Sequence, residues 1–231
     1  MSGMQPANAA LLQATIRQTA PAIPQADNAG VSGDPRDLFY LLDYLTFAVD
    51  RAYPEIPCTK GCNHCCHNQV FRVTALEWAN VRGALFAMRP DERQETLERT
   101  EALFGAYRSE LTTMAELWTR GERVPESLHE PTPKTCPMLG GDGRCTVYEA
   151  RPAICRGYGY FSATIDDVPR LLICKQEGPG WIHHLEDTGI DQLPMPNWNP
   201  VQRRLETLNE GQPIKPLPLW LLELADELKP A

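Results

Sequence analysis

The eight cysteines of this chain fall into two groups, and they limit its fold more than any other feature of the sequence. Four of them lie within the nine residues from Cys58 to Cys66, in the order Cys-Thr-Lys-Gly-Cys-Asn-His-Cys-Cys. No helix or strand separates thiols this close together, so core packing does not explain the run. Gly61 permits a tight turn, and short spacings let one loop wrap several sulfurs around one centre. The segment therefore predicts a metal site.

The second group starts at Cys136 and ends at Cys174, with Cys145 and Cys155 between them. Gly140, Gly141 and Gly143 predict a hairpin-like turn that brings the first two of these cysteines together. Four thiols in each group fit two metal sites of four ligands each, or one polynuclear centre together with a second, smaller site. The sequence leaves both partitions open.

Cys65 and Cys66 are adjacent, which adds information about the partition. In an extended chain, successive side chains point to opposite sides, so we expect these two thiols to serve different centres, or one of them not to be a ligand. For an isolated thiol such as Cys174, the alternative role is that of a small buried hydrophobe.

Imidazole and guanidinium groups flank both cysteine groups. His64 and His67 could ligate zinc or a Rieske-type iron, but with eight thiols available we expect them to lie around the ligands or at the surface. Excess negative charge on a four-thiolate site can be offset by arginine. We therefore name Arg151 and Arg156 as candidate cofactor-binding residues, whereas for Arg144 an ordinary surface ion pair is an equal alternative.

Composition and charge exclude several classes of partner. Of the 231 residues, 42% are hydrophobic, which is enough to build a core without help from a metal. A net charge of −8 disfavours nucleic acid and anionic lipid. The sequence shows no signal peptide and no stretch near the ~20 apolar residues of a membrane span. We therefore expect a cytoplasmic protein, where thiols are metal ligands more often than disulfides; secretion would revive the disulfide alternative.

Helical periodicity dominates the rest of the chain. A first helix is expected from Asp34, as N-cap, to Tyr53, and a second starts at a capping box formed by Thr74 and Glu77 and ends near Pro90. A third and longest helix is expected from 91 to 121, and a short one around Trp220 to Leu228.

These patterns predict a mainly α fold, with a helical scaffold and a small irregular cysteine-rich metal-binding subdomain. One short hairpin is expected around residues 136–148. Residues 1–33 are rich in Ala, Gln, Asn, Pro and Gly and are expected to form a mostly disordered leader. Residues 34–190 would form the helical domain with the cysteine-cluster metal site, and residues 191–231 a proline-punctuated tail with a short C-terminal helix.

The cysteine pattern resembles the YkgJ-type CxxCxxCC cysteine-cluster family of zinc- or iron-chelating domains. The likeness covers about residues 58–174 and is carried by Gly61-Cys62-x-x-Cys65-Cys66, Cys136-Pro137, Gly143-x-Cys145-x-Val147-Tyr148 and Arg151-Pro152-x-x-Cys155-Arg156. It implies that the metal ligands are Cys58, Cys62, Cys65, Cys66, Cys136, Cys145, Cys155 and Cys174. One departure is that three residues, rather than two, separate Cys58 from Cys62.

The resemblance implies a cofactor more directly than a reaction. The first hypothesis is an iron-sulfur cluster held by thiolates, with a redox role or a role accessory to protein modification, because a similar cysteine domain occurs in flagellin lysine N-methylases. The second is a structural zinc protein with four-cysteine sites that serves as a partner-binding module. The spacing of Cys58, Cys62 and Cys65 also matches the radical S-adenosylmethionine motif, but the alternating strands and helices of that fold are missing. No catalytic residue and no specific protein partner or substrate can be named.

Overall fold

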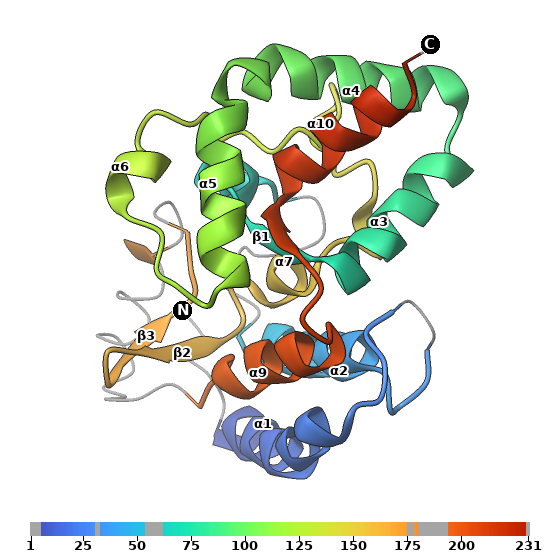
Figure 1. Ribbon diagram of the computed structural model, residues 1–231. Coiled ribbons are helices and arrows are strands. Elements are labelled where there is room, and N and C mark those ends of the chain that lie inside the picture. The colour runs from blue at the N-terminus through green and yellow to red at the C-terminus, as the bar shows by residue number, and fades with distance from the viewer. Residues whose placement is uncertain (1–5, 31–32, 54–61, 175–177, 180–193, 230–231) are drawn as a thin grey trace. The chain divides into compact units, whose positions relative to one another are not determined.

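The computed structural model describes residues 6–30, 33–53, 62–174, 178–179 and 194–229, and it confirms a mainly helical chain with a cysteine-rich region and small sheets (Figure 1). These residues group into two compact units, each made from two separate stretches of chain. Unit 1 comprises Met1–Cys65 and Ala153–Leu208, and unit 2 comprises Cys66–Pro152 and Asn209–Ala231. In the described part of the chain, every helix is too short or too polar to cross a membrane.

The N-terminal stretch of unit 1 is helical, which corrects the expectation of a mostly disordered leader. Helix α1 spans Pro6–Thr19, and a 3₁₀ helix, η1, follows over Ala20–Gln25. The reason is burial: Leu12 is fully buried in a cluster with Val49 and Tyr53, which lie at the end of the next helix. Tertiary packing thus stabilises a segment whose composition is typical of disorder.

Helix α2 spans Leu38–Ala52, and its N-cap is Asp37 rather than the expected Asp34. The Asp37 carboxylate accepts hydrogen bonds from the backbone N–H of Phe39 at 2.8 Å and of Gly30 at 3.0 Å. Asp34 instead forms the turn before the helix, where its side chain accepts from the N–H of Arg36 at 2.8 Å. Both residues are good N-caps, and contact with the preceding loop selects Asp37.

The remainder of unit 1 contains a short helix, a hairpin and a longer helix. Helix α7 spans Ala153–Gly157, strands β2 (Ser162–Ile165) and β3 (Val168–Leu171) pair antiparallel, and helix α9 spans Asn199–Leu208. The sequence patterns predict neither this hairpin nor α9. The hairpin turns at Asp166 and Asp167, whose φ angles of 51° and 60° indicate a type I′ turn.

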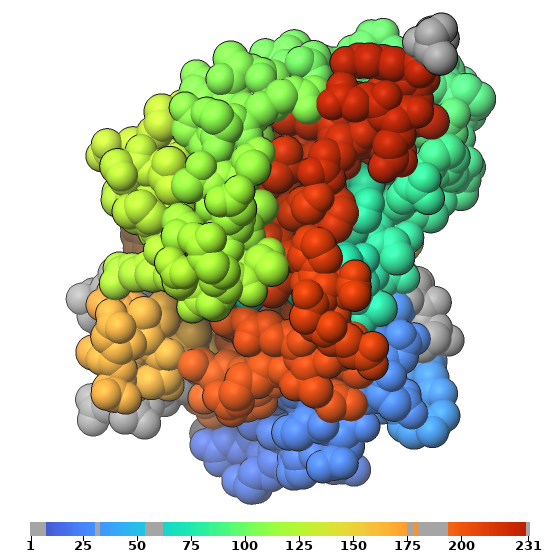
Figure 2. Space-filling model, in the orientation of Figure 1, coloured from blue at the N-terminus to red at the C-terminus, as the bar shows by residue number. Residues whose placement is uncertain are grey.

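Unit 2 is a helical assembly on a small two-stranded sheet. Its helices are α3 (Ala75–Ala87), α4 (Pro90–Phe104), α5 (Arg108–Thr119), α6 (Glu126–His129) and α10 (Leu217–Glu227). Strand β1 (Arg72–Thr74) pairs antiparallel with β4 (Ile214–Pro216). Within this unit, α10 lies between α3 and α5, as the red, teal and green surfaces of Figure 2 show.

Helix α10 completes the core of unit 2 and agrees with the C-terminal helix expected from the sequence. Leu217, Leu221 and Leu224 are buried in one cluster with residues of α3, while Leu219 and Leu222 are buried in a second cluster with residues of α5. The predicted capping box is also confirmed at the start of α3. Thr74 Oγ1 accepts from the N–H of Glu77, whose carboxylate in turn accepts from the N–H of Thr74.

The expected long third helix is wrong, because the chain breaks it at Gly105. A 3₁₀ turn, η3, over Gly105–Tyr107 separates α4 from α5. Glycine is a poor helix former, and the backbone leaves the α-helical region on either side of it, at Phe104 with φ −122° and at Tyr107 with φ −110°. The buried stripe through Leu97, Phe104 and Leu111 repeats every seven residues, a spacing that two consecutive helices satisfy as well as one.

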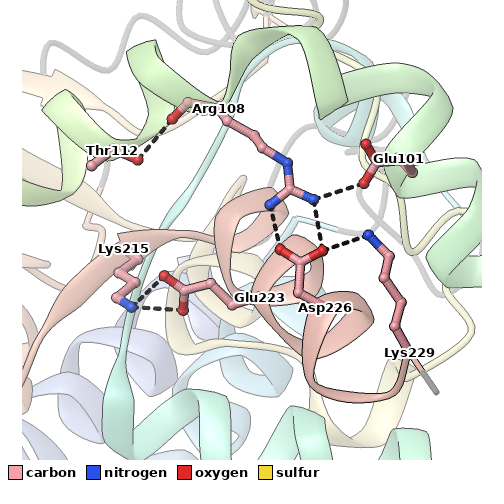
Figure 3. A network of polar contacts seen from close by, with 7 residues as sticks. All are labelled: Glu101, Arg108, Thr112, Lys215, Glu223, Asp226 and Lys229. Atoms are coloured by element: carbon pink, nitrogen blue, oxygen red, sulfur yellow. Dashed lines mark hydrogen bonds and ion pairs between the residues drawn. The ribbon is translucent and has the colours of Figure 1, made fainter. Parts of the chain in front are cut away.

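A polar network fixes α10 against the α4 and α5 region (Figure 3). The Arg108 guanidinium donates to Glu101 at 2.8 Å and to Asp226 at 2.9 Å, and Lys229 donates to Asp226 at 2.7 Å. The hydrogen bond from Lys229, helped by the charge of Arg108, holds the pKa of the Asp226 carboxyl below its usual value. The Arg108 guanidinium, at the start of α5, therefore links a carboxylate of α4 to one of α10.

Candidate metal centre

Cys66 and Cys136 come from different cysteine groups, and the fold of unit 2 brings their backbones together. The Cys136 N–H donates to the carbonyl oxygen of Cys66 at 2.6 Å. Both residues are half-buried thiols. The loop that carries the end of the first group and the loop that starts the second group are thus in direct contact.

A hairpin turn then brings Cys145 back toward Cys136, as the glycine-rich stretch predicted. Leu139 and Cys145 form an antiparallel bridge, Gly140 N–H donates to the Arg144 carbonyl at 2.8 Å, and Gly143 has a φ of 77°. Both cysteines pack against the buried cluster that contains Met138. The hairpin expected around residues 136–148 is confirmed, and three cysteines of unit 2 lie on these two contacting loops.

Unit 1 brings together the segments that carry Cys155 and Cys174. Cys155 lies on α7, and two hydrogen bonds join the end of this helix to the chain just before Cys174. Tyr158 Oη donates to the carbonyl of Ile173 at 3.2 Å, and Gly159 N–H donates to the carbonyl of Leu172 at 2.6 Å. Cys155 is half-buried and Cys174 is buried. The burial of Cys174 is compatible with a ligand and with a small core residue alike.

Cys65 and Cys66 lie in a short 3₁₀ helix, η2, over His64–His67, and not in an extended chain. Successive residues of such a helix are about 120° apart around its axis, so the two side chains start in different directions. The division between the two compact units also falls between these residues. That the two thiols bind different centres stays a prediction. Its geometric reason is now the direction of successive side chains in a 3₁₀ helix, and not in an extended chain.

Cys58, with Gly61, falls outside the described residues, so seven of the eight predicted ligands can be placed. Among the residues that the structure describes, no three side chains of His, Cys, Asp or Glu are grouped so that they could hold a metal ion. The described residues nevertheless show that segments carrying cysteines come together: those of Cys66, Cys136 and Cys145 in unit 2, and those of Cys155 and Cys174 in unit 1.

The two histidines beside the first group are exposed to solvent. Within unit 2, His67 Nδ1 lies 3.5 Å from Oγ1 of Thr135, the residue before Cys136. This contact is a second link between the two cysteine groups. Sequence reasoning had not singled out Thr135, because a threonine in a polar loop carries no distinctive signal.

Arg156 is nearly fully buried beside Cys155. Its Nη1 donates to Asp43 Oδ2 at 2.6 Å, and its guanidinium carbon lies 4.5 Å from the ring centroid of Phe39. Its backbone carbonyl accepts from Thr46 Oγ1 at 3.3 Å. Three residues of α2 therefore hold the helix that carries Cys155. The sequence analysis did not single out Asp43, because its partner lies 113 residues away in the chain.

The other two arginines differ from Arg156 in their surroundings. Arg151 is half-buried and stacks on Tyr148, with its guanidinium carbon 4.0 Å from the ring centroid. Arg144 is exposed, at the turn of the hairpin, where its N–H donates to Asp142. The cofactor-binding role of Arg151 and Arg156 stays a prediction.

The donor set fits a soft metal centre. All seven described cysteines are thiols, and thiolates favour zinc and iron-sulfur clusters over magnesium or calcium. Six of the seven are half-buried and Cys174 is buried, whereas core hydrophobes are as a rule fully covered. The residues present are therefore chemically suited to the chelation that their spacing suggests.

Comparison with known proteins agrees with this chemistry. The family model described as "CxxCxxCC: Putative zinc- or iron-chelating domain" matches residues 57–175, just over half of the chain. No curated protein and no solved structure matches. The matched range contains every cysteine of the sequence. The chain therefore belongs to the CxxCxxCC family of zinc- or iron-chelating domains.

Proposed function

We propose that this protein holds an iron-sulfur cluster through its clustered cysteine thiolates. The observation that carries the proposal is the 2.6 Å hydrogen bond between the backbones of Cys66 and Cys136, which joins the two cysteine groups. The hairpin brings Cys145 back toward Cys136. Thiolate ligands from loops rich in glycine and exposed N–H groups suit iron-sulfur clusters, whose sulfurs accept hydrogen bonds from backbone amides.

The ligands we propose are the eight cysteines predicted from the sequence, with Arg151 and Arg156 close to the cofactor. A thiolate cluster carries negative charge, and Arg156 is a buried cation one residue from Cys155. Because Arg156 is already paired with Asp43, we expect it to act chiefly by holding α7 in place. The cluster would supply electron transfer when bound.

The biological role we propose is redox chemistry, or a role accessory to the modification of another protein. The net charge of −8 argues against nucleic acid as the partner. We propose that the partner or substrate is a protein. We also propose a cytoplasmic location, because a reducing compartment keeps cysteine ligands as thiols.

A structural zinc protein is the second candidate, and the family description favours it equally, since it names zinc beside iron. In this alternative, zinc sites of four cysteines hold the cysteine-bearing loops together, and the protein serves as a partner-binding module. Zinc is bound tetrahedrally by thiolates in such sites and has no redox chemistry. The two candidates therefore differ in colour, in sulfide content and in redox activity.

The deciding experiment is purification without oxygen, followed by visible absorption, acid-labile sulfide and metal analysis on one sample. We expect a brown protein with iron and sulfide in comparable amounts. A colourless, sulfide-free protein with stoichiometric zinc would overturn the iron-sulfur proposal and support the zinc candidate. A protein without bound metal of either kind would overturn both.

The ligand assignment is tested separately by Cys66→Ser and Cys136→Ser, because both residues stand at the contact between the groups. We expect each variant to lose most of its metal. The matched control is His64→Gln, which changes an exposed side chain of the same segment and should retain metal. If Cys136→Ser keeps full metal content, or if His64→Gln loses as much as the cysteine variants, the ligand set is wrong.

A further inference from the structure

The backbone from Cys136 to Met138 is held by several hydrogen bonds within the cysteine region. The Cys136 N–H donates to the Cys66 carbonyl, and the Cys136 carbonyl accepts from the N–H of Leu139 at 3.1 Å. The Met138 carbonyl accepts from the N–H of Thr146 at 2.9 Å and from its Oγ1 at 3.1 Å. These partners all belong to the cysteine loops themselves. They hold the loops to one another, and not to the helices of unit 2.

The carbonyl of Pro137, between Cys136 and Met138, has a partner of a different kind. Arg99 Nε donates to it at 3.0 Å, across 38 positions of the chain. Pro137 is buried, so water would replace a lost donor poorly. As a proline, it has no N–H of its own with which to hold the segment. The hydrogen bond from Arg99 therefore ties the residue after Cys136 to helix α4.

The Arg99 side chain is held on its own helix before it reaches the loop. Nη1 lies 3.3 Å from the carboxylate of Glu95, and Nη2 donates to Thr96 Oγ1 at 3.4 Å, both one turn earlier in α4. The side chain of Arg99 is 23% exposed, whereas that of Glu95 is 71% exposed. Because a guanidinium is planar, two contacts at its outer nitrogens also fix the direction of the Nε–H. The donor to Pro137 is thus oriented in advance.

We propose that Arg99 is a positioning residue of the metal centre. Through the Pro137 carbonyl it holds the backbone of Cys136 in place, so the Cys136 thiol needs little rearrangement to bind metal and little freedom to leave it. Ordering a ligand loop in advance reduces the entropy lost on binding. The inference rests on the proposed function, because Cys136 must be a ligand, but it is the same for an iron-sulfur cluster and for zinc.

Two substitutions of Arg99 separate its hydrogen bond from its charge. Arg99→Met places a methyl group at the position of Nε, so it removes both the donor and the charge. Arg99→Gln places an amide nitrogen at the same position, so it restores an N–H donor without the charge. Arginine, methionine and glutamine have similar helix propensities, so neither change should weaken α4 by itself.

Two control variants test the surroundings of this hydrogen bond. Glu95→Gln keeps Arg99 and removes only its exposed ion pair. Arg108→Met is the same chemical change at another half-buried arginine of unit 2, one that binds Glu101 and Asp226 and not a cysteine loop. Its effect shows how much of any change follows from general loosening of the unit. Circular dichroism and denaturant unfolding of all four variants establish that they are folded and how stable each one is.

The measurement is the rate at which the full, metal-loaded protein releases its metal to an excess of the chelator EDTA, without oxygen. We expect Arg99→Met to release metal about tenfold faster than the wild type, since hydrogen bonds around metal ligands commonly contribute at least this much to metal affinity. Arg99→Gln should stay within about threefold of the wild type, because it keeps the donor. Glu95→Gln and Arg108→Met should stay within about twofold, because an exposed ion pair contributes little.

The proposal fails if Arg99→Met releases metal at the wild-type rate, or if Arg99→Gln releases it as fast as Arg99→Met. It also fails if either control variant accelerates release as much as Arg99→Met does, because the effect would then come from the ion pair or from general stability. Failure of the ligand assignment is seen separately, as a Cys136→Ser variant that keeps its metal. If Cys136→Ser loses metal while Arg99→Met retains it like the wild type, Cys136 is a ligand and only the role of Arg99 is wrong.

Discussion

Arg156 and Arg120 each form an ion pair at the same 2.6 Å, yet their surroundings differ completely. Arg156 has an exposed fraction of 4% and is covered by Phe39, whereas Arg120 is 56% exposed. A charge removed from water must be compensated by its partner, while an exposed pair competes with solvent and salt. Burial, and not distance, therefore decides how much each ion pair contributes.

This contrast yields a prediction for Asp43→Asn and Glu122→Gln. Asp43→Asn leaves the Arg156 cation buried without a counter-charge, and we expect it to lower the free energy of unfolding by about 1–3 kcal/mol, since Asp43 itself is half exposed. Glu122→Gln breaks the exposed pair and should change the free energy of unfolding by less than about 0.5 kcal/mol. Denaturant unfolding at low protein concentration measures both. Equal effects of the two variants would contradict the buried-pair interpretation.

The helices show which sequence signals are reliable. Thr74 and Glu77 predicted the start of α3 correctly, because a capping box is a local device whose partners are three residues apart. Asp34 was chosen as the N-cap of α2 on equally local grounds, but the Gly30 N–H, several residues earlier, selects Asp37. Gly105 broke the expected long helix, and α1 formed where composition predicted disorder. These outcomes depend on tertiary contacts that periodicity does not contain.

In the cysteine region, as in the helices, the local features could be predicted from the sequence and the long-range contacts could not. The turn between Cys136 and Cys145 followed from its glycines, which are a local signal. The contact of Cys66 with Cys136, and that of the Cys155 and Cys174 segments, could be expected only from the assumption that ligands converge. The roles of Asp43 and Thr135 had no signal, because their partners lie far away in the sequence.

The capping box of α3 gives a prediction at the scale of the element. Thr74 Oγ1 satisfies the N–H of Glu77, and Thr74 is nearly fully buried. Thr74→Ala removes this acceptor, so we expect a loss of about 1–2 kcal/mol in the free energy of unfolding. Thr74→Ser keeps the hydroxyl and should lose less than half as much, with thermal or denaturant unfolding as the measurement. An alanine variant as stable as the serine variant would mean that the cap contributes nothing.

At the scale of the whole molecule, cysteines belong to both compact units, so metal binding would stabilise each of them. If the proposed function holds, removal of metal by a chelator should lower the thermal unfolding midpoint by several degrees or more. Iron should also quench the fluorescence of the stacked pair Trp78 and Trp220, which packs in the same cluster as Cys136 and Cys145. Circular dichroism and tryptophan emission, before and after chelation, measure both. An apoprotein that melts at the same temperature would contradict a stabilising role of the metal.

The place of α10 in the core of unit 2 has a consequence for how the protein is made. A ribosome synthesises Cys136 and Cys145 well before Leu217, Leu221 and Leu224, which complete the buried cluster against which both cysteines pack. During that interval the nascent chain displays its thiols while the surrounding apolar surface is still uncovered. We therefore expect the nascent chain to be most prone to thiol oxidation and to aggregation before α10 has emerged.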